Sequence, residues 1–549
     1  MPDQLLGGAD TGIAAQQKPD LNNSSQFAQL IDVITALSSE RNINKLYEKI
    51  VETAQALTRA DGVTLYIVDT NQQPPVLQFA IVRNNSLDLK LGGDAAAPIN
   101  FAPIPLIQAN GQKNLSNISA WVYHKQTPFN IKDAYTVADF DFSGTKKFDQ
   151  KTGYRSESML TLPLLNHADD VVGVLQLLNA KDADNQTIIF DESAQRLALA
   201  LASSAAITLD TQGLIQSHKD LLDAFVQVIA KAIDAKSSHT SAHCQRVPAL
   251  TELLAQAACQ TNEGPLKDFT LNDDEWYELH VAAWLHDCGK LATPDHILDK
   301  ATKLHLLTDR IEIIQARFAA HIAQLENQLL GTTDKDEQKA LKEQIKQRRD
   351  DCAFLVTANQ GGEFMQTSDQ ERVRAIGQLR WVDIQGQEQP LLTAEEIDLL
   401  CIERGTLSAD ERQIINDHIV VTIDMLEELP FPKHLARVPE YAGGHHERVD
   451  GKGYPKGLRG DQMSWPARMM AIADVFEALT ARDRPYKEPM RLSQALGILK
   501  NMAETGHIDP DLYQIFISKK VWHRYGQQYL LAEQLDVTAK EAQNYLLSP

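Results

Sequence analysis

Residues 282–291 read AAWLHDCGKL, and this stretch decides how we interpret the second half of the chain. An apolar helical pattern ends here in the doublet His286-Asp287, which offers one imidazole and one carboxylate to the same metal ion. Gly289 follows, and we expect it to let the backbone leave the helix. Taken alone, the doublet could also hold a buried structural histidine near a helix end.

The helix that carries this doublet has a clear predicted start. Asn272 and Glu275 form a pair typical of a capping box, in which each side chain satisfies a backbone N–H group of the first turn. We expect this helix to bury Leu279, Ala282 and Ala283 on the face that continues to the doublet.

A second stretch, GGHHERVDGKGYP at residues 443–455, contains the adjacent pair His445-His446. Gly451 and Gly453 permit backbone conformations that other residues disfavour. The loop is therefore predicted to turn sharply beside the histidine pair. An incidental surface pair of histidines is the alternative.

Two further candidate residues lie on apolar helical patterns. His418 shares a stripe with Ile414, Val421 and Met425, where a histidine is normally a core residue with its hydrogen bonds satisfied. Asp474 lies within an apolar run, and a carboxylate buried there is costly unless it is paired or bound to metal. Asp474 is therefore the strongest single-residue argument for a metal site.

The His286-Asp287 doublet and the Gly-Tyr-Pro run at residues 453–455 together resemble the HD-GYP family, metal-dependent phosphodiesterases that open cyclic dinucleotides. The two motifs lie far apart and each is long, which makes the match specific. The segment AIDAKSSHTSAHCQRV at residues 232–247 is similar to the opening helix and loop of the family. The resemblance implies an all-α domain of the HD superfamily.

The resemblance implies seven metal ligands, too many for one metal with an open position and suitable for two metals that share a bridging group. The expected bridge is Asp287. A ligand set without cysteine suits iron or manganese best and also fits zinc. Some family members hold a third metal through a glutamate at the position of His239 here, so two or three metals stay open. The expected ligands are His243, His286, Asp287, His418, His445, His446 and Asp474.

The resemblance also implies which residues act in the reaction. Two metals lower the pKa of a bridging water, and the resulting hydroxide would attack the phosphorus in line. We expect Lys290, beside the catalytic carboxylate of Asp287, to neutralise charge in the transition state, with a solvated lysine as the alternative. The expected substrate contacts are Lys303, Arg448, Gly451, Tyr454, Arg484 and Lys487.

The implied function is hydrolysis of cyclic di-GMP to pGpG, with a further step to GMP left open, in bacterial second-messenger signalling. A hybrid cyclic GMP-AMP dinucleotide is an alternative substrate, because no motif marks the residues that read the bases. A catalytically idle receptor is a second alternative, although the DGKGYP run is intact. The GYP loop is also expected to contact a diguanylate cyclase partner.

The first half of the chain mixes helical and strand patterns and predicts an α+β module. Residues 148–164 (FDQKTGYRSESMLTLPL) and 171–181 (VVGVLQLLNAK) resemble a GAF domain, a sensory module. The predicted elements are a helix over 27–57, strands at 63–69, 76–81, 159–165 and 171–178, and a returning helix over 191–209.

A ligand for the GAF domain stays open. Asn179, Lys181, Phe190, Asp191 and Glu192 are similar to a signature of GAF domains that bind cyclic nucleotides, but here Phe190 directly precedes Asp191 with no intervening residues. A small-molecule ligand and a domain that only dimerises are both open interpretations. The resemblance implies regulation of the second domain and a homodimer.

Composition limits the other classes of partner. With 43% hydrophobic and 23% charged residues and a net charge of −21, the chain suits a soluble globular protein and argues against a DNA or acidic-membrane binder. Five scattered cysteines without a CxxC pair argue against disulfides and thiolate zinc sites. Neither a signal peptide nor a membrane span is expected, and we expect a cytoplasmic protein.

A chain of 549 residues exceeds what one core usually supports. Helical patterns dominate from residue 218 onward, a region that contains 14 of the 16 histidines. Residues 334–351 carry six basic and six acidic residues and predict a solvated helix or helical hairpin. The expected order is a flexible segment 1–24, a GAF domain 25–210, a connecting helix 211–235 within a helical run over 191–235, and an HD-GYP domain 218–549 with a helical insertion at about 306–405.

Overall fold

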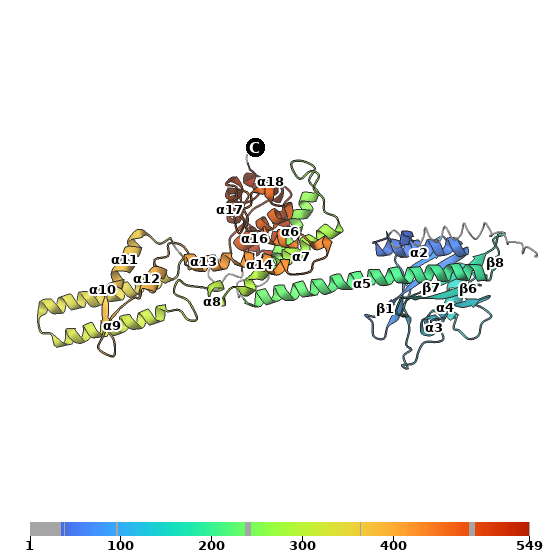
Figure 1. Ribbon diagram of the computed structural model, residues 1–549, viewed down its shortest axis with the longest axis horizontal. Helices are drawn as coiled ribbons and strands as arrows, with labels where there is room; N and C mark the ends of the chain where they lie inside the picture. Colours follow the sequence, from blue (N-terminus) through green and yellow to red (C-terminus); the bar gives the residue numbers. More distant parts are fainter. Residues whose placement is uncertain are drawn as a thin grey trace, which may run out of the picture. The chain divides into compact units, whose positions relative to one another are not determined.

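The computed structural model of the chain divides into two compact units, residues 1–220 and 221–549 (Figure 1). It describes residues 35–37, 39–94, 97–236, 243–362, 364–482 and 489–547. The expected flexible segment 1–24 lies outside the described residues. Each unit has its own apolar core.

The first unit is built on one antiparallel sheet. Its strands are β1 (Ala60–Asp69), β2 (Val76–Asn84), β3 (Leu89–Leu91), β4 (Ile104–Pro105), β5 (Phe129–Ile131), β6 (Met159–Leu165), β7 (Val171–Lys181) and β8 (Thr187–Ile188). The main path runs β3-β2-β1-β7-β6-β5, with β4 paired to β2 and β8 to β7. The four predicted strands are all present, and β6 has the predicted bounds. The α+β prediction is confirmed.

Helices cover both faces of this sheet. They are α2 (Ile43–Thr58), α3 (Ile118–Lys125), α4 (Ser143–Thr152) and the first part of α5 (Glu192–Lys236). Leu46 of α2 and Leu201 of α5 share one core with Leu65 of β1. The next residue of β1, Tyr66, is buried on the opposite face together with Val122 of α3. Burial on both faces explains why the central strands are almost continuously apolar.

The predicted helix over residues 27–57 is interrupted in the structure: residues 35–37 and 39 are helical, residues 40–42 are not, and α2 follows. The side chain of Asn42 accepts hydrogen bonds from the backbone N–H groups of Asn44 and Lys45, at 2.9 and 3.1 Å, and so starts α2 at Ile43. Residues 27–34 lie outside the described part of the chain.

The predicted long helix over residues 191–235 is confirmed by α5, which is continuous over 45 residues. Among the described residues, α5 is the helix whose length and composition would allow it to cross a membrane. However, 39% of its most apolar window is buried, and Leu201, Ala205 and Leu209 belong to the core of the first unit. At its far end, the Lys236 ammonium donates to the backbone carbonyl of Leu291.

The second unit is dominated by helices. Its elements outside the insertion are α6 (His243–Cys259), α7 (Asp273–Leu285), η1 (Cys288–Ala292), α8 (Asp295–Leu298), α13 (Ala409–Asn416), α14 (His418–Glu427), η2 (Lys433–Leu435), α15 (Val438–Gly443), η3 (Gly460–Gln462), α16 (Trp465–Thr480), α17 (Leu492–Glu504), α18 (Pro510–Ser518), α19 (Val521–Tyr529), η4 (Ala532–Gln534) and η5 (Glu541–Tyr545). The largest core joins Leu254 of α6, Phe476 of α16, Phe516 of α18 and Trp522 of α19.

The start of α7 agrees with the sequence prediction. The Asn272 side chain accepts from the backbone N–H of Glu275, and the Glu275 carboxylate accepts from that of Asn272, so the capping box is complete. Leu279, Ala282 and Ala283 are buried, as predicted. These contacts fix the start and the packing of α7, and therefore the position of its last turn.

The insertion contains a helical hairpin and a small sheet. Its elements are α9 (Ile311–Gly331), α10 (Lys335–Asn359), α11 (Thr367–Gly377), β9 (Arg380–Val382), β10 (Glu388–Pro390) and α12 (Ala394–Leu400). Leu325 of α9 packs against Leu341 and Ile345 of α10, while Glu326 and Arg349 form an exposed ion pair at 3.0 Å. The predicted charged helical hairpin is confirmed.

The strands β9 and β10 correct the prediction that the second domain is entirely helical. They pair antiparallel around a turn in which the Asp383 carboxylate accepts from the backbone N–H groups of Gln385 and Gln387, both at 2.9 Å. Gly386 adopts a φ of +79° in the same turn. This turn chemistry, rather than a long strand pattern, creates the hairpin.

Gly289 has a different role from the predicted helix exit. It lies inside η1, and a Cβ added to it would approach the carbonyl oxygen of His418 to 2.0 Å and the backbone nitrogen of Thr422 to 2.6 Å. Its N–H donates to Thr422 Oγ1 at 2.9 Å. The absence of a side chain therefore allows α14 to pack directly against the turn that follows His286-Asp287.

We predict that Gly289→Ala destabilises the second unit by about 2 to 3 kcal/mol, because the added methyl group must displace backbone of α14. Gly497→Ala is the matched control, since an added Cβ there has no neighbour within 4 Å and the residue is exposed in α17. Chemical denaturation followed by circular dichroism measures both variants. Equal stability of Gly289→Ala and the parent protein would contradict the close-packing role.

Candidate metal centre

The structure brings all seven predicted ligands together, although they come from five separate segments. They are His243 at the start of α6, His286 and Asp287 after α7, His418 at the start of α14, His445 and His446 after α15, and Asp474 within α16. All are buried except His446 and Asp474, which are partly exposed. Most of the site is therefore formed by helix ends that meet in the interior of the second unit.

Asp287 occupies the middle of this cluster. Its Oδ2 lies 3.2 Å from Nε2 of His243 and 3.4 Å from Nε2 of His286. Its Oδ1 lies 3.3 Å from Nε2 of His418. The Lys290 ammonium lies 2.6 Å from Oδ2. The two oxygens of this one carboxylate therefore face different groups of imidazoles.

Backbone carbonyls fix the orientation of three histidines. The Nδ1 atom of each ring bonds to the carbonyl three residues earlier, at 2.7 Å for His286, 2.5 Å for His418 and 2.6 Å for His445. A carbonyl can only accept, so Nδ1 carries the proton and Nε2 keeps its lone pair. Helix ends supply these carbonyls because their last C=O groups have no partner within the helix. Each Nε2 is therefore prepared to bind a metal.

Buried atoms without partners test whether the site fits a metal. Among the described residues, Nε2 of His243, His286, His418 and His445 are buried and have no hydrogen-bond partner, and the same holds for Oδ1 of Asp287. Leaving this many buried donor and acceptor atoms unpaired would be costly in a purely structural core. The donor set of imidazoles and carboxylates without thiolates suits iron, manganese or zinc.

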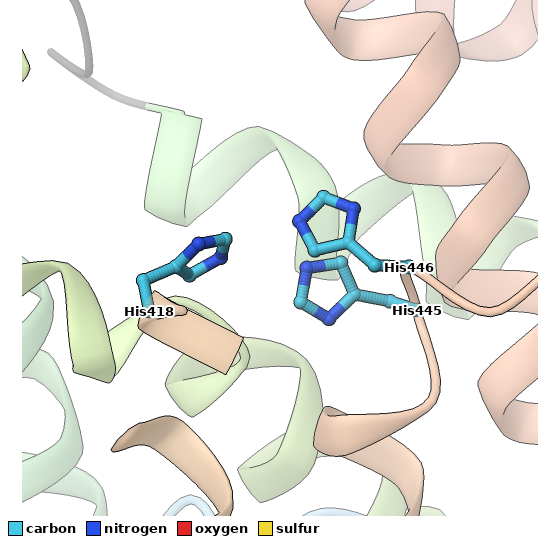
Figure 2. A group of neighbouring side chains, drawn as sticks. All are labelled: His418, His445 and His446. Carbon is cyan, nitrogen blue, oxygen red and sulfur yellow. The ribbon is translucent and has the colours of Figure 1, made fainter. Parts of the chain in front are cut away.

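The possible donor atoms form three overlapping groups, and the group of His286, Asp287 and His445 shares a residue with each of the other two. His418, His445 and His446 form one group, whose rings converge in Figure 2, and His243, His286 and Asp474 form another. In each group, the possible ligand atoms all lie within 4.8 Å of one another. Asp474 has a side chain that is 17% exposed, so its carboxylate faces the rim of the site rather than the closed core we expected.

Electrostatics favour neutral imidazoles at His445 and His446. Burial and the neighbouring His286 lower the pKa of His445 to about 4. Burial, His445 and His418 hold the pKa of His446 well below its usual value. A neutral imidazole is the form that binds a metal, so this environment favours coordination at neutral pH.

Burial raises the pKa of the Asp287 carboxyl, but Lys290 and His286 outweigh it and keep the group ionised. Burial likewise lowers the pKa of Lys290, while Asp287 and Asp474 raise it above its usual value. The site therefore contains a fixed cation directly beside its central anion.

The sequence analysis missed Glu477, which lies one helical turn after Asp474. Its Oε2 lies 2.5 Å from Nδ1 of His243, and its Oε1 accepts from Nε of Arg246 at 2.7 Å. Burial raises the pKa of Glu477, but His243 and Arg246 lower it to about 2. Glu477 therefore orients His243, the role that backbone carbonyls play for His286, His418 and His445. Its position three residues after Asp474 was the signal that could have found it.

Glu447 is a second residue that the sequence analysis missed. Its carboxylate accepts from the backbone N–H groups of Lys456 and Leu458 at 2.7 and 2.8 Å. Gly453 packs against it, since an added Cβ would lie 2.5 Å from Glu447 Cα. Gly453 is thus required because the backbone of Glu447 lies too close for a side chain. Gly451 is required for a different reason, because it has a φ of +78°, as predicted for this loop. Glu447 therefore closes the loop around its own side chain.

The other predicted site residues differ in their placement. The ring of Tyr454 stacks on His446 with centroids 4.8 Å apart, so it lies beside the ligands. Lys303 does not reach the site: its side chain is buried in the insertion, and its ammonium donates to the carbonyls of Leu400 and Ile402 at 2.9 and 2.8 Å. His239, Arg484 and Lys487 lie outside the described residues.

The prediction that His418 shares a buried helical stripe with Ile414, Val421 and Met425 is also wrong. A helix end at Asp417 separates α13 from α14, and Ile414 and Met425 are exposed. The buried face of α14 instead contains His418, Ile419 and Thr422. The break places His418 at a helix start, where its ring can reach the carbonyl of Ile415.

Comparison with known families agrees with both units. The profile of the GAF domain matches residues 42–209, and that of the HD domain matches residues 395–512. The chain joins a GAF domain to an HD domain. The HD match includes His418, His445, His446 and Asp474, and it begins after the His286-Asp287 doublet.

Several curated proteins are similar in sequence. A 3'3'-cGAMP-specific phosphodiesterase of Vibrio cholerae is 25% identical over 306 residues, which cover 56% of this chain and 42% of that protein. A probable cyclic di-GMP phosphodiesterase of the same organism is 36% identical over 125 residues, or 22% of this chain and 28% of that protein. A cyclic di-GMP phosphodiesterase of Pseudomonas aeruginosa is 47% identical over 74 residues, which cover 13% and 17%. The chain thus spans less than half the length of these relatives.

We predict that Glu477→Gln weakens metal binding about 10- to 100-fold, because the amide can no longer hold the ring of His243 through a charge-assisted hydrogen bond. Titration with Mn²⁺ followed by calorimetry measures the affinity. Glu504→Gln, an exposed substitution at the end of α17, is the control and should bind as the parent protein does. Unchanged affinity in Glu477→Gln would show that His243 needs no orienting partner.

Proposed function

We propose that this protein is a metal-dependent phosphodiesterase that hydrolyses cyclic dinucleotides. The observation that carries the proposal is the buried carboxylate of Asp287, which lies within 3.4 Å of three imidazoles and 2.6 Å from the Lys290 ammonium. Unpaired Nε2 atoms around a shared carboxylate suit two metals with Asp287 as the bridge. The names of the similar proteins support the class of substrate.

The side chains of this chain have distinct roles in the proposed reaction. His243, His286 and Asp474 would hold one metal, and His418, His445 and His446 the other. Bound metals would supply an activated water and would stabilise charge on the phosphodiester. Lys290, which Asp287 holds in its charged form, places a positive charge beside the reacting phosphate. Tyr454 lies against His446 at the edge where a substrate would enter.

The proposed metals are iron or manganese, because the ligands are imidazoles and carboxylates and no cysteine takes part. Among the described residues, the donor groups His418-His445-His446 and His243-His286-Asp474 share no residue, which supports two metals, and the group of His286, Asp287 and His445 overlaps both. A third metal would need His239. Metal analysis of protein purified without oxygen tests both number and identity.

The proposed substrate is cyclic di-GMP, and 3'3'-cyclic GMP-AMP is the second candidate because relatives with each specificity are similar to this chain. An idle receptor is disfavoured, since the seven predicted ligands all belong to the three overlapping groups of possible donors. We further propose that the GAF domain regulates this activity in the cytoplasm and that the chain forms a homodimer. The GYP loop remains the proposed contact for a cyclase.

We predict that Asp287→Ala removes bound metal and abolishes turnover of cyclic di-GMP, because both donor groups lose their shared ligand. Metal content is measured by elemental analysis and turnover by chromatography of the products. Retained activity in Asp287→Ala would exclude the bridging role.

We predict that Lys290→Ala keeps its metals and loses about 10²- to 10³-fold in kcat, because it lacks the fixed cation near the phosphate. The control is Lys433→Ala, an exposed lysine in η2 that should leave both quantities unchanged. If fully metallated parent protein binds cyclic dinucleotides and cleaves none of them, the enzyme proposal is wrong and the receptor is correct.

A further inference from the structure

A pocket of about 480 Å³ opens directly beside the candidate ligands. His445, His446 and Asp474 form its inner side. The floor is apolar and is formed by Val475 and Leu479 of α16, together with Met502 and Ile508, which come from α17 and the loop after it. Met502 and Ile508 therefore form one wall of the pocket, and no sequence motif predicts that these residues lie there.

A backbone hydrogen bond attaches this wall to the GYP loop, and a second one holds the wall together. The backbone N–H of Asp450 donates to the carbonyl of Gly506 at 2.9 Å. Gly506 adopts a φ of +73°, and an added Cβ would lie 3.3 Å from Asp450 Cβ. The backbone N–H of His507 then donates to the carbonyl of Met502 at 2.8 Å. These bonds hold His507 at the pocket, in the electrostatic range of Arg448.

Arg448 has unused hydrogen-bonding capacity on this side. Its Nη2 donates to the Asp450 carboxylate at 2.8 Å, which fixes the guanidinium plane. Its Nε is buried and has no hydrogen-bond partner among the described residues. The side chain lines the pocket and is 28% exposed, so the terminal N–H groups of the guanidinium, rather than the buried Nε, are prepared to bind a planar acceptor group.

His507 offers a second polar group. Burial lowers its pKa, and the nearby Arg448 lowers it further, while Asp450 opposes the shift. The ring is therefore neutral at neutral pH and has one donor and one acceptor nitrogen. No hydrogen bond joins either ring nitrogen to another group within the described ranges 243–362, 364–482 and 489–547.

We propose that this pocket is the base subsite of the enzyme and that it selects guanine, with Arg448 and His507 as the residues that read the base. The inference rests on the proposed cleavage of cyclic dinucleotides and assigns their recognition to specific side chains. The apolar floor of Leu479, Met502 and Ile508 suits the flat face of a purine. Guanine presents two acceptors, O6 and N7, to an arginine, whereas adenine presents a donor in place of O6. Arg448 therefore favours guanine and disfavours adenine.

The test compares three substrates on the full-length, metal-loaded protein: cyclic di-GMP, 3'3'-cyclic GMP-AMP and cyclic di-AMP. The parent protein should cleave cyclic di-GMP with a kcat/KM at least about tenfold above that for cyclic di-AMP. Arg448→Met should reduce this ratio about tenfold while metal content stays constant. His507→Ala should raise KM for cyclic di-GMP about tenfold with kcat within about threefold, since the residue touches the base and not the metals.

His434→Ala, an exposed histidine of η2, is the matched control and should behave as the parent protein does. Equal kcat/KM for cyclic di-GMP and cyclic di-AMP in the parent protein would overturn guanine selection. Unchanged kinetics in both Arg448→Met and His507→Ala would overturn the subsite. Absence of cleavage of all three substrates by the parent protein would instead overturn the proposed function, and the relative binding of cyclic di-GMP and cyclic di-AMP would then decide the base preference separately.

Discussion

The second unit depends on one constraint: the carboxylate of Asp287 must remain ionised in the protein interior. Burial opposes the charge, and Lys290 and the surrounding imidazoles compensate for it. Because a buried charge without partners is strongly destabilising, the helices that carry His243, His286 and His418 must converge on this one group. Gly289 allows that convergence, since any side chain there would separate α14 from the turn after α7.

The histidines show how helix ends can serve as ligand supports. Each of three rings bonds to the backbone carbonyl three residues earlier in the chain. The carbonyl groups that a helix leaves unpaired at its end therefore orient candidate metal ligands. At His243, the first residue of α6, the carboxylate of Glu477 takes this orienting role.

Local patterns predicted much of this molecule. Strand alternation, the capping box at Asn272 and the continuous helical run of α5 all depend on neighbouring residues, and each appears in the structure. The seven candidate ligands could be named from the sequence because they lie in motifs, and the structure brings them into overlapping groups. Glu477 and the wall at His507 depend on which helices meet, and local sequence does not contain that information. Lys303 was misplaced for the same reason, because its partners at Leu400 and Ile402 are a hundred residues away in the chain.

The contacts of Lys303 have a consequence for how the insertion can change in length during evolution. The two ends of the insertion are held together by the Lys303 ammonium on the carbonyls of Leu400 and Ile402, and by Thr406 Oγ1 on the carbonyl of Lys300 at 3.0 Å. The insertion also has its own core, which includes Phe318 and Leu355. A segment whose ends already meet can be lengthened, shortened or exchanged at small entropic cost. The region between Lys300 and Thr406 is thus a position where evolution, or a protein engineer, can add a module while the ligands on either side keep their places.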